Sequence, residues 1–367
     1  KYKDSLADIA SHVIDTWKAD RESRSEWEAM HAQWLRLYYQ KDKPKNPPWE
    51  GASDESLPLL AEGCTQFSAR AYKAMFPGQQ IIRCVPTGQA TAEDKARAER
   101  VGRHMSHQLM VKDKTYKRNK DRLLLSLPLH GHFFTKTFYD PTIKRNVVRN
   151  VRATDLIVPY GTGPREVDDL SRKTEMVWKP MHECRRLVKA GYFIEEPEPY
   201  KASDKKPDDE ALKVVEGVTE SPLDPDPPAL LLEQHLYWDL EEDGTADPYI
   251  ATVCAQSQKV LRLTIRWETD DSGKETDDRR PVEYYTSYSY MENPDGFYGL
   301  GQGHLIAQAN IAVNKLLRQT IDAATLANVG NHSGFFSDQL AGISGGELVM
   351  KLGKYVKVPA SAEDMKN

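Results

Sequence analysis

The sequence predicts a mixed α+β fold, with long helices towards both ends of the chain and a β-rich portion between them. Apolar residues recur at helical spacing from Asp4 to Tyr39 and again from His304 to Ala327. Between residues 133 and 290, short runs of β-branched and aromatic residues are typical of strands. The chain has 367 residues, 39% of them hydrophobic, so it can bury a core and divide into more than one folding unit.

The first third of the chain is expected to be mainly helical. A polar stretch at Asp20–Ser25 interrupts the first helical pattern, which predicts one broken helix or two. Prolines at positions 44, 47 and 48 indicate an extended segment, and a further helix is predicted from Pro58 to Met75. We then expect a strand at Ile81–Val85 and one long helix from Ala92 to Leu127, whose mixed charges suit solvent or neighbouring subunits.

After residue 128 the pattern predicts sheet. A short amphipathic helix at Pro180–Ala190 and a proline-rich, charged stretch at 195–228, interpreted as a solvated loop, separate the strands. Two more short strands are expected at Glu347–Met350 and Tyr355–Val358. The main predicted strands are Phe133–Tyr139, Asn146–Val151, Leu156–Val158, Glu233–Leu240, Tyr249–Cys254, Val260–Trp267 and Val282–Tyr290.

Charge and cysteine content limit the classes of function. Lys and Arg number 50 against 55 Asp and Glu, a net charge of -5, so any contact with DNA must be local or loose. The cysteines lack zinc spacing and are expected to be reduced, buried thiols. For the protein as a whole we expect a soluble intracellular protein that is not an enzyme and has no cofactor. Lys1 and the last residues resemble the middle of a protein, which predicts a fragment. The cysteines are Cys64, Cys84, Cys184 and Cys254.

Three motifs resemble ligand sites and fail in detail. Gly299, Gly301 and Gly303 precede a helix, as phosphate-binding loops do, but neither a dinucleotide fingerprint nor a Walker loop is complete, so a flexible start to the helix is favoured. His130 and His132 could together bind a metal ion, but the sequence shows no third ligand near them. His182-Glu183 resembles the start of a metalloprotease motif, but its second histidine is missing. Structural roles are expected for these histidines.

An acidic segment matches part of a calcium-binding loop. Its candidate ligands are Asp239, Glu241, Asp243 and Asp247. Position twelve of the loop is Ile250 instead of Glu, and the segment lies between predicted strands. We therefore expect an acidic hairpin turn and keep calcium as a minor hypothesis.

The C-terminal helix has two distinct faces. Lys315, Arg318 and Asp322 share one face, opposite an apolar stripe. One interpretation is a packed helix with one solvated edge; the other is a helix in a ring whose polar edge lies near a channel, with Lys315 and Arg318 as candidates for contact with DNA. The stripe comprises Leu305, Ala309, Ala312 and Leu316.

A series of collinear segments resembles the portal proteins of tailed bacteriophages, over nearly the whole chain. None of the segments is a chemical signature alone, and their order along the chain carries the resemblance. They are Trp49–Ser53, Leu57–Gly63, Gln66–Tyr72, Leu124–Gly131, Phe133–Lys136, Glu233–His235, Asp247–Tyr249, Gly296–Gly299 and Arg318–Asp322.

The resemblance implies a multi-region α+β subunit of a ring, typically of about twelve copies, at one capsid vertex. Its helices would form wing and stem, around a channel through which double-stranded DNA passes without sequence recognition. Residues 1–230 would be mainly wing, 231–295 a β-rich module including the clip, 296–330 the stem helix and 331–367 the start of a return to the wing, with the tunnel loop and crown missing.

The implied partners are other copies of the chain, the terminase, head-completion or adaptor proteins and the major capsid protein. The implied location is the virion, and the host cytoplasm during assembly, with no membrane partner. Two alternatives stay open: a metal-dependent enzyme acting on nucleic acid or nucleotides, and another virion protein such as an adaptor.

Overall fold

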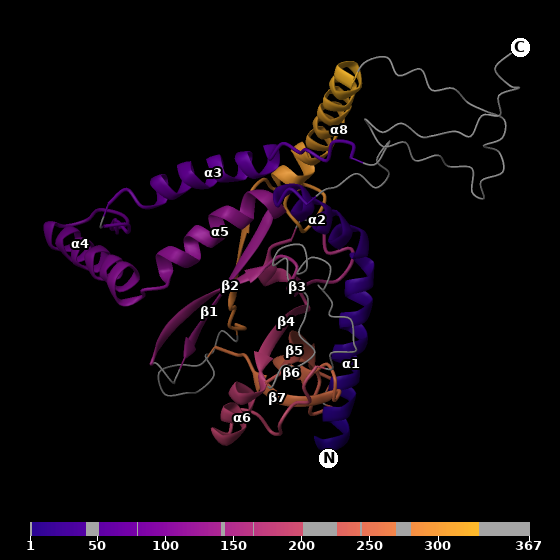
Figure 1. Cartoon of the computed structure of the whole chain (residues 1–367). Helices are drawn as coiled ribbons and strands as arrows, with labels where there is room; N and C mark the ends of the chain where they lie inside the picture. The colour runs from indigo at the N-terminus through magenta and orange to yellow at the C-terminus, as the bar shows by residue number, and fades with distance from the viewer. Residues whose placement is uncertain are drawn as a thin grey trace, which may run out of the picture.

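The computed structural model describes residues 2–41, 51–78, 80–140, 144–163, 165–200, 226–242, 244–268 and 280–329. The fold combines helices with two antiparallel sheets, so the predicted α+β class is confirmed. A body formed by the two sheets and the first helix carries two projections (Figure 1). One is an arm of three helices, and the other is the C-terminal helix.

The first helical region is broken as expected. Helix α1 (Tyr2–Ser23) and helix α2 (Ser25–Tyr38) meet at Arg24. The Arg24 side chain is buried, and its guanidinium donates to the carbonyl oxygens of Ala153 at 3.2 Å and Leu156 at 2.9 Å. The break therefore lets a charged side chain enter the body and bind carbonyl groups there. Preceding it, α1 packs its apolar face on the larger sheet.

The projecting arm consists of α3 (Leu59–Met75), α4 (Ala92–His107) and α5 (Tyr116–His130) (Figure 1). The prediction of one helix from Ala92 to Leu127 was wrong. After a π-helical turn at Gln108–Lys112 the chain turns at Asp113, whose Oδ1 accepts hydrogen bonds from the backbone N–H of Thr115 at 3.0 Å and from its hydroxyl at 2.6 Å. Such local side-chain bonds compete with helical ones.

The strand expected at Ile81–Val85 does not form in the described part of the arm. The backbone N–H of Ile82 donates to the Ser106 hydroxyl at 3.1 Å, and Gly102 of α4 lets the helix approach the Ile82 carbonyl. The extended segment is thus bound to a helix side chain instead of to a neighbouring strand. A strand pattern in sequence cannot show which kind of partner the backbone meets.

The body contains a three-stranded sheet of order β2-β1-β8 and a five-stranded sheet of order β3-β4-β5-β6-β7. The stretch 231–295 contributes strands to both sheets, and each sheet also contains strands from before residue 230. Helix α6 (Met181–Lys189) packs on the larger sheet. The strands are β1 (His132–Asp140), β2 (Arg145–Arg152), β3 (Leu156–Ile157), β4 (Lys173–Pro180), β5 (Pro228–Trp238), β6 (Asp247–Cys254), β7 (Lys259–Ile265) and β8 (Tyr285–Ser289).

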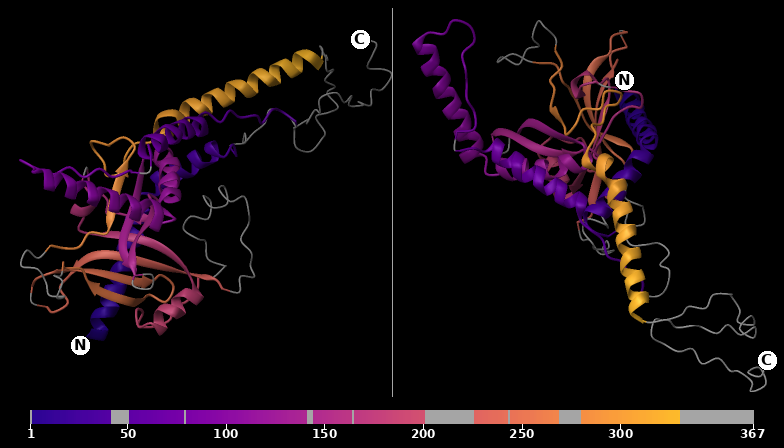
Figure 2. Two further views of the ribbon diagram at one scale, coloured as in Figure 1. Left: turned by 90° about the vertical axis from the view of Figure 1, so that its left-hand side faces the viewer. Right: turned by 90° about the horizontal axis from the view of Figure 1, so that it is seen from above.

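Helix α8 (Gln302–Val329) is 28 residues long and extends away from the body (Figure 2). Its far end and the N-terminus of α1 lie at opposite ends of the molecule (Figure 1). No helix in the described ranges is both long and apolar enough to span a membrane.

Some predicted features lie outside the described residues: most of the proline-rich stretch (201–225), the segment 42–50, Asp243, and everything from residue 330 onwards with its two expected strands. The four cysteines are all described and free, three of them buried and Cys84 half-buried. Burial raises the pKa of the Cys64 thiol to about 12.

Candidate functional site: the root and faces of helix α8

Helix α8 begins at a close crossing of two backbone segments. Gly131, which ends α5 with a φ of +82°, lies against Gly299 and Gly301. A Cβ atom added at Gly301 would lie 2.5 Å from the backbone nitrogen of Gly131 and 2.7 Å from the carbonyl oxygen of Pro128. One added at Gly303 would lie 2.4 Å from the Trp34 ring. The glycines are needed because no side chain fits at this crossing.

This crossing corrects the expectation of a flexible start to the helix, because Gly301 and Gly303 are buried. Three backbone N–H groups of the glycine segment, which a phosphate would need as donors, already have acceptors within the chain. The backbone N–H of Gly299 donates to His132 Nδ1 at 3.1 Å, that of Leu300 to the Met291 carbonyl at 2.8 Å, and that of Gly301 to His304 Nδ1 at 3.0 Å. The cluster is a close-packed joint between α5 and α8.

Beyond the joint, one face of α8 is bonded to the extended segment 53–57 and the start of α3. We call this set of bonds the polar ladder; it uses four α8 side chains spaced four residues apart. Each binds a backbone group: Asn310 Oδ1 accepts from Leu60 N–H at 3.1 Å, Asn314 Oδ1 from Leu57 N–H at 2.8 Å, and Asp322 Oδ1 from Ser53 N–H at 2.8 Å, while Arg318 Nε donates to the Glu55 carbonyl at 2.9 Å.

The polar ladder changes the interpretation of the candidate residues on α8. Arg318 and Asp322 face the chain's own 53–57 segment, whereas Lys315 is exposed. Sequence reasoning missed Asn310 and Asn314, although both are buried. Two asparagines four residues apart in an apolar helix were the available signal, because buried amide groups need hydrogen-bond partners.

The apolar stripe on α8 is exposed, which contradicts the interpretation of a packed helix with one solvated edge and leaves the ring interpretation as a proposal. Leu305 is 57% exposed and Leu316 is 62% exposed. Ala309 and Ala312, on the same face, are exposed as well. The helix therefore exposes this apolar stripe, while the four side chains of the polar ladder on its other side are bonded within the chain.

A second constellation, the ionic cluster, lies between the two sheets. Glu175 of β4 and Glu233 of β5 are directly opposite in the ladder of the larger sheet, where like charges repel. Lys136 of β1 in the smaller sheet bonds to both, at 3.1 Å to Glu175. The Glu175 carboxylate also accepts from Arg149 and, at 2.8 Å, from the Tyr285 hydroxyl. The cluster joins the sheets through charges.

The same interface contains a second group of charges. Lys173 is fully buried and donates to the Val167 carbonyl at 2.9 Å, while its ammonium and the Arg266 guanidinium both bind Glu283. His235 lies opposite Lys173 on the neighbouring strand, with its Nε2 3.8 Å from Glu233, beyond hydrogen-bond distance. The sequence shows these residues only as alternating polar positions in strands.

Electrostatics in the ionic cluster follow from burial and from these contacts. Burial alone would raise the pKa of Glu233, but the Lys136 ammonium holds that pKa well below its usual range. Burial lowers the pKa of His235 to about 4, so its ring is neutral near pH 7. Burial and the Glu175 carboxylate raise the pKa of Tyr285, which keeps its hydroxyl protonated as a donor.

The histidines noted in the sequence have structural positions. His130 stacks on His31 with ring centroids 5.1 Å apart, and His132 accepts the Gly299 amide. The exposed His182 pairs with Asp226 near the start of α6. The described residues contain no group of three or more His, Cys, Asp or Glu side chains placed to hold a metal ion.

The candidate calcium ligands lie at and after the end of β5. Asp239 Oδ2 accepts a hydrogen bond from the backbone N–H of Gly244 at 2.8 Å, as a tight acidic turn does, and Asp247 is opposite Trp238 at the start of β6. Glu241 is exposed, and Asp243 lies outside the described residues. The segment joins two antiparallel strands, as the hairpin interpretation predicts.

Buried neutral histidines make stability depend on pH. Burial lowers the pKa of His31, His132 and His235 to about 4, against about 6.5 in an unfolded chain. The unfolded state therefore binds more protons at acid pH. The contribution of these histidines to the free energy of unfolding is fully present well above pH 6.5 and is lost as the pH drops towards 4. At pH 5 the loss is about 2 kcal/mol for each histidine.

This pH dependence is checked by urea denaturation between pH 7.5 and 5. In His132→Asn the side-chain oxygen can still accept the Gly299 amide, so the decline should become shallower. His107→Asn, at an exposed position on α4, is the matched control and should leave the decline unchanged. A midpoint that stays constant across this range would contradict the burial of neutral histidines.

No family model matches the chain, and the comparison with curated proteins found no match.

Proposed function

We propose that this chain is the portal subunit of a tailed bacteriophage, a ring-forming structural protein through which DNA enters and leaves the capsid. The order of the segments that resemble portal proteins supports the proposal. The structural observation that carries it is the exposed apolar stripe on α8, whose opposite face is held by the polar ladder. In this proposal the stripe is the face of α8 that contacts another subunit.

Another copy of the chain is the partner that the proposal assigns to this stripe. Burying a leucine side chain stabilises a contact by about 1.5–3 kcal/mol, and several residues of the stripe would be buried together. If the stripe of one copy meets a different face of the next copy, the contact is heterologous, and a closing rotation produces a ring. Helices α8 of successive copies would then surround a channel.

In this proposal α8 is the stem, and the body with its arm is the wing. Strands β5 to β8 share both sheets with strands from before residue 230. We therefore assign them to the wing, in place of the expected module with the clip. Such a subunit would contact the terminase during packaging, then adaptor proteins, and the major capsid protein around the wing.

For the DNA channel, Lys315 is the better of the two candidates. Arg318 donates to the Glu55 carbonyl, whereas the exposed Lys315 is on the solvent side of α8. Contacts with passing DNA would be few, because many phosphate contacts would hold the duplex in place. Double-stranded DNA would therefore be a cargo in transit without sequence recognition.

The test is the assembly state of the purified chain and of Leu316→Glu. Electron microscopy class averages of the wild type should show rings with a central hole wide enough for duplex DNA. A glutamate in the stripe should abolish the rings without lowering the melting temperature of the monomer, because Leu316 is already 62% exposed there. Gln89→Glu adds the same charge at an exposed position before α4 and should leave assembly unchanged.

Two outcomes would contradict the portal proposal. One is a compact monomer or dimer of the wild-type chain under conditions that permit assembly. The other is a ring that forms equally well from Leu316→Glu, because α8 would then not supply the lateral contact. A ring without a central hole would favour another virion component.

A further inference from the structure

Strand β7 has backbone groups that face away from the sheet. It is the edge strand of the five-stranded sheet, next to β6. Since the N–H of Arg266 donates to the Pro248 carbonyl at 3.0 Å, the alternation of an antiparallel ladder directs the N–H and C=O of Leu263 and Ile265 outwards. In the described ranges, no backbone group bonds to these two residues on that side.

The free part of the edge is short and has defined ends. At one end the backbone N–H of Ile194 donates to the Leu261 carbonyl at 2.8 Å, and at the other Trp267 pairs with Pro281. With a rise of about 3.3 Å per residue, an added strand of about four residues fits between them. The segment at Ile194 already shows that this edge accepts a strand-like backbone.

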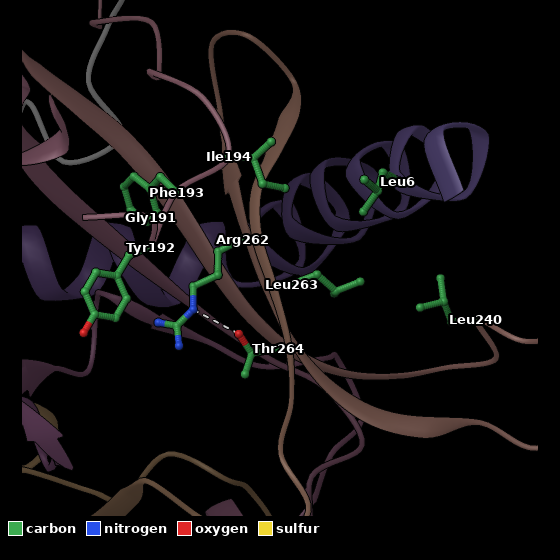
Figure 3. Close-up of a pocket in the computed structure, with 9 residues that line it drawn as sticks. All are labelled: Leu6, Gly191, Tyr192, Phe193, Ile194, Leu240, Arg262, Leu263 and Thr264. Atoms are coloured by element: carbon green, nitrogen blue, oxygen red, sulfur yellow. Dashed lines mark hydrogen bonds between the residues drawn. The ribbon is translucent and has the colours of Figure 1, made fainter. Parts of the chain in front are cut away.

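A cavity of about 550 Å³ lies beside this edge (Figure 3). Successive side chains of a strand point to opposite faces of the sheet, yet Arg262, Leu263 and Thr264 all line this one cavity. A cavity that meets both faces of a strand must lie along its outer edge. The free backbone groups and the space beside them therefore coincide.

The two sides of the cavity differ in chemistry. On the side of α1, Leu263 is joined by Leu6 and Leu240. On the other side Arg262 donates from Nε to the Thr264 hydroxyl at 2.9 Å, and its guanidinium lies 6.0 Å from the centre of the Tyr192 ring (Figure 3). Its two terminal NH₂ groups have no hydrogen-bond partner among the described residues and suit a carboxylate.

We infer that the free edge of β7 binds a short extended segment of another protein chain as an added strand, with apolar and acidic side chains in alternation. The apolar side chains would contact Leu6, Leu240 and Leu263, and the acidic ones Arg262. Backbone pairing at a sheet edge with side-chain pockets on either side is an established mode of peptide recognition. This inference is independent of the portal proposal.

The test uses a fluorescein-labelled Val-Glu-Val-Glu-Val peptide and its Val-Lys-Val-Lys-Val counterpart, titrated into the full chain by fluorescence anisotropy. The wild type should bind the glutamate peptide at least tenfold more tightly than the lysine peptide. Arg262→Glu should reverse that preference. Lys259→Glu is the matched control, because Lys259 pairs with Glu195 outside the cavity, and it should bind as the wild type does.

A proline at position 263 tests the backbone pairing itself. The N–H of Leu263 is not used by β6, so Leu263→Pro removes the outward donor without removing a bond of the ladder. It should weaken peptide binding at least tenfold while circular dichroism and the melting temperature stay close to the wild type. Should this variant unfold, Arg262→Glu still decides the charge preference.

Three results would overturn the inference. The first is no saturable binding of either peptide by the wild type up to about 1 mM, a free energy of only about -4 kcal/mol. The second is equal binding by Leu263→Pro and the wild type. The third is slow hydrogen exchange of the Leu263 and Ile265 amides in the free protein, which would mean that another part of this chain already covers the edge.

Discussion

Replacing Lys136 by methionine should destabilise the fold by about 3–5 kcal/mol. Glu175 and Glu233 are opposite each other on adjacent strands, and Lys136 bonds to both from the other sheet. Without the ammonium, two negative charges would face each other between the sheets with less compensation. The free energy of unfolding from urea denaturation at pH 7.5 measures this loss.

Two comparisons separate the charge effect from simple loss of a side chain. Lys95→Met, at an exposed position on α4, should change stability by no more than about 0.5 kcal/mol. Adding Glu175→Gln and Glu233→Gln to Lys136→Met should recover part of the loss, because the unpaired charges disappear. A cost below about 1 kcal/mol for Lys136→Met would show that the ionic cluster does not hold the sheets together.

Replacing Gly301 by alanine should cost about 3 kcal/mol, at the upper end of overpacking effects. The added methyl group would lie 2.5–2.8 Å from three backbone atoms of the α5 end, which cannot rotate away. The joint between α5 and α8 would have to open. Thermal unfolding measures the loss of stability, and limited proteolysis detects release of α8 from the body.

Gly78→Ala is the matched control for this prediction. A Cβ atom at Gly78 would meet nothing within 4 Å, and its φ is not in the left-handed region. The control should therefore melt within a degree or two of the wild type, because a neutral change in ΔG barely moves the midpoint. If Gly301→Ala also melts like the wild type, the close crossing is not required for the position of α8.

Most local elements could be predicted because they depend on residues close together in the chain. The helical spacing around Asp20–Ser25 predicted a break, and the structure confirms it at Arg24. The seven main strand segments were also found, with shifted ends. The prediction of one long helix after Ala92 was wrong because the Asp113 side chain stabilises a turn there. The spacing of apolar residues does not show a single side-chain hydrogen bond of this kind.

The candidate site could be predicted only in part. The glycines before α8 were visible, but their role depends on Gly131, which is far away in sequence and close in space. The sequence left two interpretations of α8 open, because a helical pattern identifies an apolar face without showing whether the same chain covers it. Here backbone N–H groups of residues 53–60 donate hydrogen bonds to the polar side chains of α8.

Although it missed β4 and the turn at Asp113, the sequence determined by itself the α+β class, seven of the eight described strands and the break in the first helical region. These follow from side-chain periodicity and from glycine and proline, which act within a few residues. Only the tertiary structure decided that β8 joins β1, that Lys136 meets Glu175 and Glu233, and that the asparagines of α8 bind residues 57 and 60. Those partners are brought together by packing over long separations, where hydrogen-bond and charge satisfaction select among many pairings that a local pattern leaves equal.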